Sequence, residues 1–229
     1  MTLSQKFPGG KRIAVTTSWD DGTIDDRRLI ESLNTWGIKG TFNLNSGNLG
    51  KTNYVEPGEV SSLYAGHEVA IHTVTHPHLT ELDAASISKE VSDDRKALEE
   101  LVGYNVRGMA YPFGDYDQKV INVLREMNIS YCRTVENPDP CFPPAERLAW
   151  GNTCHHLAKN PSPVERFFRL IENPGAPTVL AIWGHSWEFS RANDWDALQR
   201  VFQRLAAHPE VWYCTNIELF DWFDGSGEE

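Results

Sequence analysis

The sequence lacks several features that would point to a membrane, secreted or redox protein. It contains no apolar run of roughly 18 or more residues, so we expect no transmembrane helix. Its first eight residues do not have the basic-then-apolar layout of a secretory signal, which predicts a cytoplasmic protein. None of the four cysteines forms a C-x-x-C pair, so we expect free or buried thiols rather than a zinc ribbon or redox site: Cys132, Cys141, Cys154 and Cys214.

Positive charge is also scarce. The 229 residues include 21 Lys and Arg against 32 Asp and Glu, giving a formal net charge of −11. Nucleic-acid binders and proteins of anionic membrane surfaces normally present a basic face, so we expect neither partner. A neutral substrate, or one that becomes cationic on reaction, fits this charge better. The sequence does not fix an oligomeric state.

The chain is long enough for one substantial core but short for two, which predicts a single domain over residues 1–229. Apolar periodicity predicts strands at 12–18, 40–44, 68–71, 107–111, 130–135, 148–152, 178–183 and 211–215. It predicts helices at 25–36, 59–64, 84–102, 118–127, 164–172, 196–207 and 217–223. This alternation indicates a parallel sheet covered by helices. Because no glycine-rich dinucleotide fingerprint follows the first strand, a barrel is favoured over an open Rossmann sheet.

Polar clusters follow four of the predicted strands. In α/β barrels the carboxyl ends of the strands converge on one face, where active sites form. We therefore expect these clusters to share one site: Asp20-Asp21-Gly22, His72-x-x-x-His76, Tyr111-Pro112-Phe113-Gly114 and Gly184-His185.

The histidine pair has the spacing of two metal ligands. On a helical turn, His72 and His76 would share one face and could bind one ion. Such a pair is often incidental, and His78 is an alternative partner. A carboxylate beside two histidines gives three protein ligands with open positions, which is typical of a catalytic metal site.

The acidic doublet could supply that carboxylate. Adjacent residues leaving a strand point in different directions, so one can bind a metal while the other takes a proton. The alternative is a helix cap made by Asp21 or Thr23.

A late histidine offers acid chemistry. His185 is either hydrogen-bonded at the barrel rim or a charged imidazole that protonates a departing amine. Glu188 either pairs with His185 and keeps it protonated or faces solvent. Three tryptophans near the motifs either pack in the core or stack on a sugar ring: Trp19, Trp183 and Trp187.

Four segments together carry a family resemblance. They are TTSWDDG from residue 16, HTVTHPHL from 72, AYPFG from 110 and LAIWGH from 180. In this order the set resembles the polysaccharide deacetylase family, that is, the NodB homology domain or carbohydrate esterase family 4, over about residues 12–216. The resemblance implies a distorted (β/α)7 barrel and a divalent metal ion, zinc foremost, with cobalt or nickel as alternatives. It also implies an acetylated carbohydrate substrate.

The resemblance assigns roles to individual residues. It makes Asp21, His72 and His76 the metal ligands, Asp20 the general base and His185 the general acid. Tyr111, Phe113 and Trp187 are expected to bind substrate, with a backbone N–H such as that of Phe113 stabilising the oxyanion. Should His185 not be the acid, His155 and His156 are the next candidates.

These roles describe a hydrolase in which metal-activated water removes an acyl group, N-acetyl foremost, from a carbohydrate. Two alternatives remain open on the same scaffold. One is an amidase or deformylase of a small molecule, and the other is an inactive carbohydrate-binding relative.

The chain departs from the family pattern at one position. Many relatives carry an arginine that orients the base in an R-P-P-Y-G stretch, but Ala110 stands there in this sequence. Arg107 lies three residues earlier, and nothing in the sequence shows that it substitutes. Loops at 46–57 and 136–147 are expected to determine the substrate.

Overall fold

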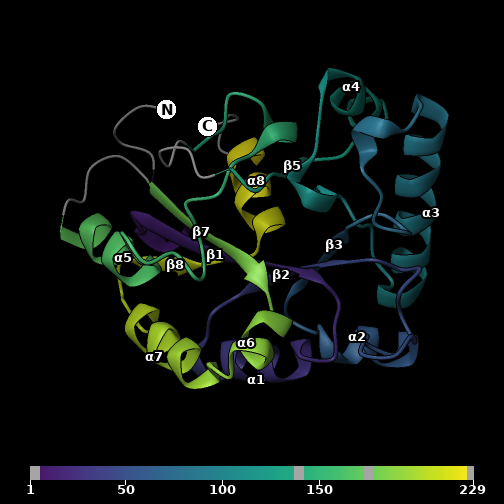
Figure 1. The fold of residues 1–229 in the computed structure, drawn as a ribbon. Coiled ribbons are helices and arrows are strands. Elements are labelled where there is room, and N and C mark those ends of the chain that lie inside the picture. The colour runs from purple at the N-terminus through teal and green to yellow at the C-terminus, as the bar shows by residue number, and fades with distance from the viewer. Residues whose placement is uncertain (1–5, 137–141, 173–177, 226–229) are drawn as a thin grey trace.

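The computed structural model describes residues 6–136, 142–172 and 178–225 (Figure 1). Cys141 and part of the predicted specificity loop, residues 137–141, lie outside these ranges. The strands are β1 Ile13–Asp21, β2 Gly40–Leu44, β3 Glu68–Ile71, β4 Gly108–Ala110, β5 Tyr131–Arg133, β6 Cys154–His155, β7 Thr178–His185 and β8 Val211–Tyr213. The helices are α1 Asp26–Trp36, α2 Val60–Leu63, α3 Ala84–Val102, α4 Gln118–Glu126, α5 Pro163–Glu172, α6 Trp187–Ala192, α7 Trp195–Leu205 and α8 Asn216–Gly225.

The strands form one parallel sheet in the order β5-β4-β3-β2-β1-β7-β6. β1 is its centre, because it pairs with β7 on one side and with β2 on the other. β8 pairs with the first three residues of β1, before the part that pairs with β2. The residues of β1 before Asp21 are all buried, which is typical of a parallel strand covered on both faces.

The two edges of the curled sheet are linked by the segment that precedes β6. The backbone N–H of Trp150 donates to the carbonyl of Cys132 at 3.0 Å, and the N–H of Thr134 donates to the carbonyl of Trp150 at 2.8 Å. Three residues later, the N–H of Thr153 donates to the carbonyl of Ala181 on β7 at 2.9 Å. The segment therefore bridges β5 and β7, and the predicted distorted (β/α)7 barrel is confirmed.

One predicted strand lies elsewhere in the structure, and one short helix was not predicted. The strand expected at 148–152 is a 3-10 turn, Arg147–Ala149, followed by a single bridge at Trp150, and the regular pairing is β6 further along. Helix α6 was not predicted, because it is only six residues long.

The helices cover the sheet in groups. Figure 1 shows α3 and α4 together at the β3–β5 end and α1, α6 and α7 along the lower side of the view. Within the described ranges, no helix is both long and apolar enough to cross a membrane. The buried cysteines Cys132, Cys154 and Cys214 are free thiols, as expected.

Candidate active site

The four polar clusters meet at the carboxyl ends of the strands. They surround a cavity of about 560 Å³. All eight predicted site residues border it: Asp20, Asp21, His72, His76, Tyr111, Phe113, His185 and Trp187. Trp183 and Val135 complete its walls. The expectation that one face gathers these clusters is confirmed in the structure.

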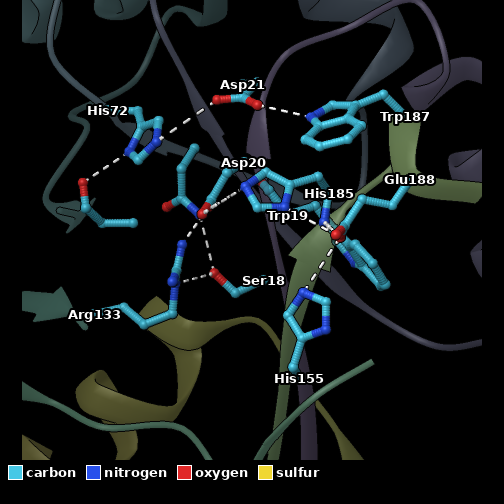
Figure 2. A network of polar contacts seen from close by, with 12 residues as sticks. Ser18, Trp19, Asp20, Asp21, His72, Arg133, His155, His185, Trp187 and Glu188 are labelled. Atoms are coloured by element: carbon cyan, nitrogen blue, oxygen red, sulfur yellow. Dashed lines mark hydrogen bonds and ion pairs between the residues drawn. The ribbon is translucent and has the colours of Figure 1, made fainter. Parts of the chain in front are cut away.

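Three nitrogen and oxygen atoms are arranged to hold a metal ion. Oδ1 of Asp21 lies 3.9 Å from Nε2 of His72 (Figure 2), and it also lies 3.9 Å from Nε2 of His76. Nδ1 of His72 lies 2.8 Å from the carbonyl oxygen of Ala110, so Nδ1 carries the proton and the lone pair of Nε2 faces Asp21. This donor set fits a divalent ion with open positions.

A turn, not a helix, brings the histidines together. His72 directly follows β3, and His76 has a left-handed φ of 58° with its N–H donating to Oγ1 of Thr73 at 3.1 Å. The prediction that the two histidines share one face of a helix was therefore wrong. They do lie against the same carboxylate, that of Asp21. His78 is not the partner of His72, because its Nδ1 lies 3.4 Å from Asp115 and its ring stacks on Phe113.

The helix-cap alternative for the doublet is also wrong. Residue 25 is the N-cap of α1, and it makes no side-chain cap bond. Asp21 instead faces the two histidines, and the hydroxyl of Thr23 lies 3.0 Å from that of Ser186.

Asp20 is buried beside Asp21, and its two carboxylate oxygens have different surroundings. Its Oδ1 accepts hydrogen bonds from Arg133 and, at 2.8 Å, from Asn43. Burial alone would raise the pKa of the Asp20 carboxyl, but the charge and hydrogen bond of Arg133, with His72 and His185 nearby, hold this pKa below its usual value. Asp20 is therefore an ionised carboxylate at neutral pH.

Arg133 takes the place of the arginine that the sequence lacks at residue 110. Ala110 and Arg133 are partners across β4 and β5, so the guanidinium comes from the neighbouring strand at the same level. Arg107 does not substitute, because it forms an exposed ion pair with Asp221 at 2.7 Å. Arg133 was not predicted from the sequence, because the register between β4 and β5 is not visible in either strand alone.

His185, the last residue of β7, faces Asp20. Its Nε2 lies 4.0 Å from Oδ2 of Asp20, and its Nδ1 lies 3.1 Å from Oε2 of Glu188. Burial lowers the pKa of His185, but the hydrogen bond to Glu188 and the charges of Asp20 and Asp21 outweigh this effect. The pKa of His185 is therefore above its normal value. Of the two alternatives for Glu188, pairing with His185 is the correct one.

Two more imidazoles surround the same carboxylate. Nε2 of His156 lies 2.7 Å and Nε2 of His155 3.3 Å from Oε2 of Glu188. Although burial opposes it, the hydrogen bonds from the three histidines hold the pKa of Glu188 well below its normal value. His155 and His156 thus reach this network behind His185 and do not line the cavity.

The spacing of His155, His185 and Glu188 would also admit a metal ion. The hydrogen bonds argue against it. The N–H of Leu157 donates to Nδ1 of His155 at 3.2 Å, so Nε2 of His155 carries the proton and donates to Glu188. We therefore interpret this group as a hydrogen-bonded carboxylate.

The aromatic residues divide between core and cavity. Trp19 is fully buried and donates to Thr17 at 2.9 Å, so a role in sugar stacking is excluded for it. Tyr111 is buried with its hydroxyl donating to the carbonyl of Leu148 at 2.6 Å, so that hydroxyl is already engaged. Phe113, with a left-handed φ of 58°, is 56% exposed. Its ring stacks on His78 and borders the same cavity as Trp183 and Trp187.

Comparison with known proteins identifies a family model and several curated relatives that match this chain. The family model described as polysaccharide deacetylase matches residues 8–132. Chitin deacetylase 1 from Cryptococcus neoformans var. grubii is 30% identical over 115 residues, which make up 49% of this chain and 24% of that protein. The chain thus spans about a quarter of that relative's length. Arg133, His185 and Glu188 lie outside the residues that the family model matches.

Solved structures share the fold over nearly the whole chain. A structure from Mycobacterium smegmatis described as a polysaccharide deacetylase aligns with a TM-score of 0.74 at 17% identity, covering 97% of this chain and 94% of the other. The allantoinase PuuE aligns with a TM-score of 0.76 at 15% identity and the same coverage. At these identities the likeness concerns the fold.

Proposed function

Because this chain belongs to the polysaccharide deacetylase family, we propose that it is a metal-dependent hydrolase that removes N-acetyl groups from a carbohydrate. One observation carries the proposal. A three-ligand metal group, an ionised buried aspartate and a histidine with a raised pKa border the same cavity. Chitin deacetylase 1 is similar to this chain over about half of its length, and it supports an N-acetylated sugar as the substrate class.

The metal ligands would be Asp21, His72 and His76. When bound, a divalent ion supplies Lewis acidity, which lowers the pKa of water and polarises a carbonyl group. Zinc suits a site of two imidazoles and one carboxylate.

Asp20 acts as the general base. Its Oδ1 is engaged by Arg133 and Asn43, so Oδ2 is the oxygen that accepts a proton. As this oxygen takes a proton from water, the water oxygen bonds to the acyl carbon, and the π pair of the carbonyl group moves onto the carbonyl oxygen. The low pKa of Asp20 keeps it ionised for this step.

His185 acts as the general acid. Its Nδ1–H is held by Glu188, so Nε2 is free to deliver a proton towards the cavity. As the C=O bond forms again and the C–N bond breaks, the electron pair of the C–N bond stays on nitrogen, which takes the proton from Nε2, and acetic acid and an amine result. Return of the proton from Asp20 to His185, 4.0 Å away, restores both groups.

The cavity walls support a neutral sugar. Trp183, Trp187 and the exposed ring of Phe113 offer faces against which a pyranose can pack. The net charge of −11 repels neither a neutral substrate nor a product that becomes cationic in the reaction.

The proposal is tested by acetate release from N-acetylglucosamine oligomers, measured beside a panel of small amides and cyclic ureides. We expect release from the oligomers that a chelator abolishes and zinc restores. His72→Ala should lose both metal and activity. Turnover of the small amides alone would favour the amidase alternative, and bound metal without any turnover would favour an inactive relative.

A further inference from the structure

Trp187 contacts the carboxylate of the candidate metal site directly. Its indole Nε1 donates to Oδ2 of Asp21 at 2.9 Å (Figure 2), while Oδ1 of the same carboxylate faces His72 and His76. We propose that Trp187 is a positioning residue that holds Asp21 as a one-oxygen ligand of the metal. This inference rests on the metal site of the proposed function.

The physical reason lies in the freedom of a carboxylate. The carboxylate group of an aspartate can turn about its Cβ–Cγ bond, and it can bind an ion through one oxygen or through both. A hydrogen bond to Oδ2 fixes the plane of the group and occupies a lone pair, so Oδ1 is presented to the ion. Within the described ranges, Trp187 is the one hydrogen-bond donor to the Asp21 side chain. Asp21 is also partly exposed and has a left-handed φ of 86°, so burial alone does not fix its orientation.

Trp187 is held in place by its chain neighbours. The hydroxyl of Ser186 donates to the buried Asp26 at 2.5 Å. On the other side, Glu188 is fixed by His155 and His156. The indole is therefore anchored by both flanking residues, independently of any substrate.

Trp183 provides a matched control. It borders the same cavity, but its Nε1 is buried and has no hydrogen-bond partner among the described residues. Its ring instead packs on the guanidinium of Arg133, 5.0 Å from the ring centroid. Trp183→Phe thus removes an indole N–H that bonds nothing, whereas Trp187→Phe removes the N–H that bonds Asp21.

The experiment measures zinc affinity by competition with a chromophoric chelator, for the wild type and for Trp187→Phe, Trp183→Phe and His72→Ala. Removing a hydrogen-bonding partner of a metal ligand typically costs about 10- to 100-fold in affinity, and we expect a loss in this range for Trp187→Phe. Trp183→Phe should stay within about twofold of the wild type, because its N–H supports no ligand. The visible spectrum of the cobalt-loaded protein should change in Trp187→Phe but not in Trp183→Phe, because Asp21 can turn its second oxygen to the ion only when the indole N–H is absent.

The outcomes separate this inference from the proposed function. If Trp187→Phe binds zinc as tightly as the wild type while His72→Ala does not, the role of Trp187 is wrong and the metal site stands. If the wild type and His72→Ala bind zinc alike, the metal site itself is wrong. Denaturant unfolding of the metal-free variants checks that each is folded, and Trp187→Tyr is measured in the same way should the Phe variant not fold.

Discussion

At the scale of single residues, two adjacent aspartates have different surroundings. Asp20 is buried against Arg133 and Asn43, whereas Asp21 faces two histidines and Trp187. The alternation of side chains at the end of β1 sends the two carboxylates in different directions. Adjacent residues of one chemical type can therefore serve as ligand and base.

Substitution by asparagine should separate these roles. Asp21→Asn removes a charged ligand, so metal occupancy should fall. Asp20→Asn should keep the metal but lower kcat by roughly 10²-fold or more, because a general base is lost. Metal content and kcat measured on the same samples test this. Equal metal loss in the two variants would mean that the roles are misassigned.

At the scale of elements, the pairing of β4 with β5 determines which cationic side chain reaches Asp20. The register sets Arg133 beside Ala110, and the arginine reaches Asp20 on β1 and the ring of Trp183 on β7. A side chain from one strand thus ties together two others in the sheet. The end of β7 and the start of α6 form a second unit, since His185, Trp187 and Glu188 each contact a different part of the site.

Replacing Arg133 should shift the acidic side of the pH profile. Arg133 lowers the pKa of Asp20, so Arg133→Ala should raise that pKa. Because the base must be ionised, the fall in kcat/KM on acidification should then begin at a higher pH. The variant should also lose stability, by about 3–5 kcal/mol for a buried charge left without its partner.

Arg107→Ala is the control for this change. Arg107 pairs with Asp221 at the surface, and such pairs contribute about 0–1 kcal/mol. Its pH profile should match that of the wild type. An unchanged acidic limb in Arg133→Ala, with the metal retained, would show that Asp20 is not the group that titrates there.

At the scale of the whole molecule, closure of the barrel completes the group of side chains around Glu188 and His185. The segment that bridges β5 to β7 continues into β6 and brings His155 and His156 against Glu188, on the first turn of α6. Gly184 on β7 makes room for this contact, because a Cβ there would lie 2.0 Å from the ring of His156. The carboxylate that raises the pKa of His185 is therefore held by residues about 30 positions away in the chain.

Removing the charge of Glu188 should shift the alkaline side of the profile. The hydrogen bond that His185 donates to Glu188 raises the pKa of His185, so Glu188→Gln should lower this pKa. An acid must be protonated to act, so kcat should decline at a lower pH than in the wild type. Glu165→Gln, an exposed glutamate on α5, is the matched control and should leave the profile unchanged. If the alkaline limb stays in place in Glu188→Gln, the titrating acid is another group.

The sequence by itself determined where the reactive residues stand along the chain. Strands and helices alternate with local periodicities, and polar residues that follow buried strands can be recognised one segment at a time. In this way Asp20, Asp21, His72, His76 and His185 were found, and the parallel architecture placed them on one face.

Tertiary structure decided what each of these residues contacts. The register of β4 and β5 sets Arg133 opposite Ala110, and the bridge at Trp150 replaced an expected strand. Trp19, which directly precedes the aspartates, lies in the core. Trp187 donates a hydrogen bond to Asp21. Such contacts join strands distant in sequence, and their free energies depend on register, burial and side-chain geometry. No local pattern encodes those quantities, because they exist only once the sheet has closed.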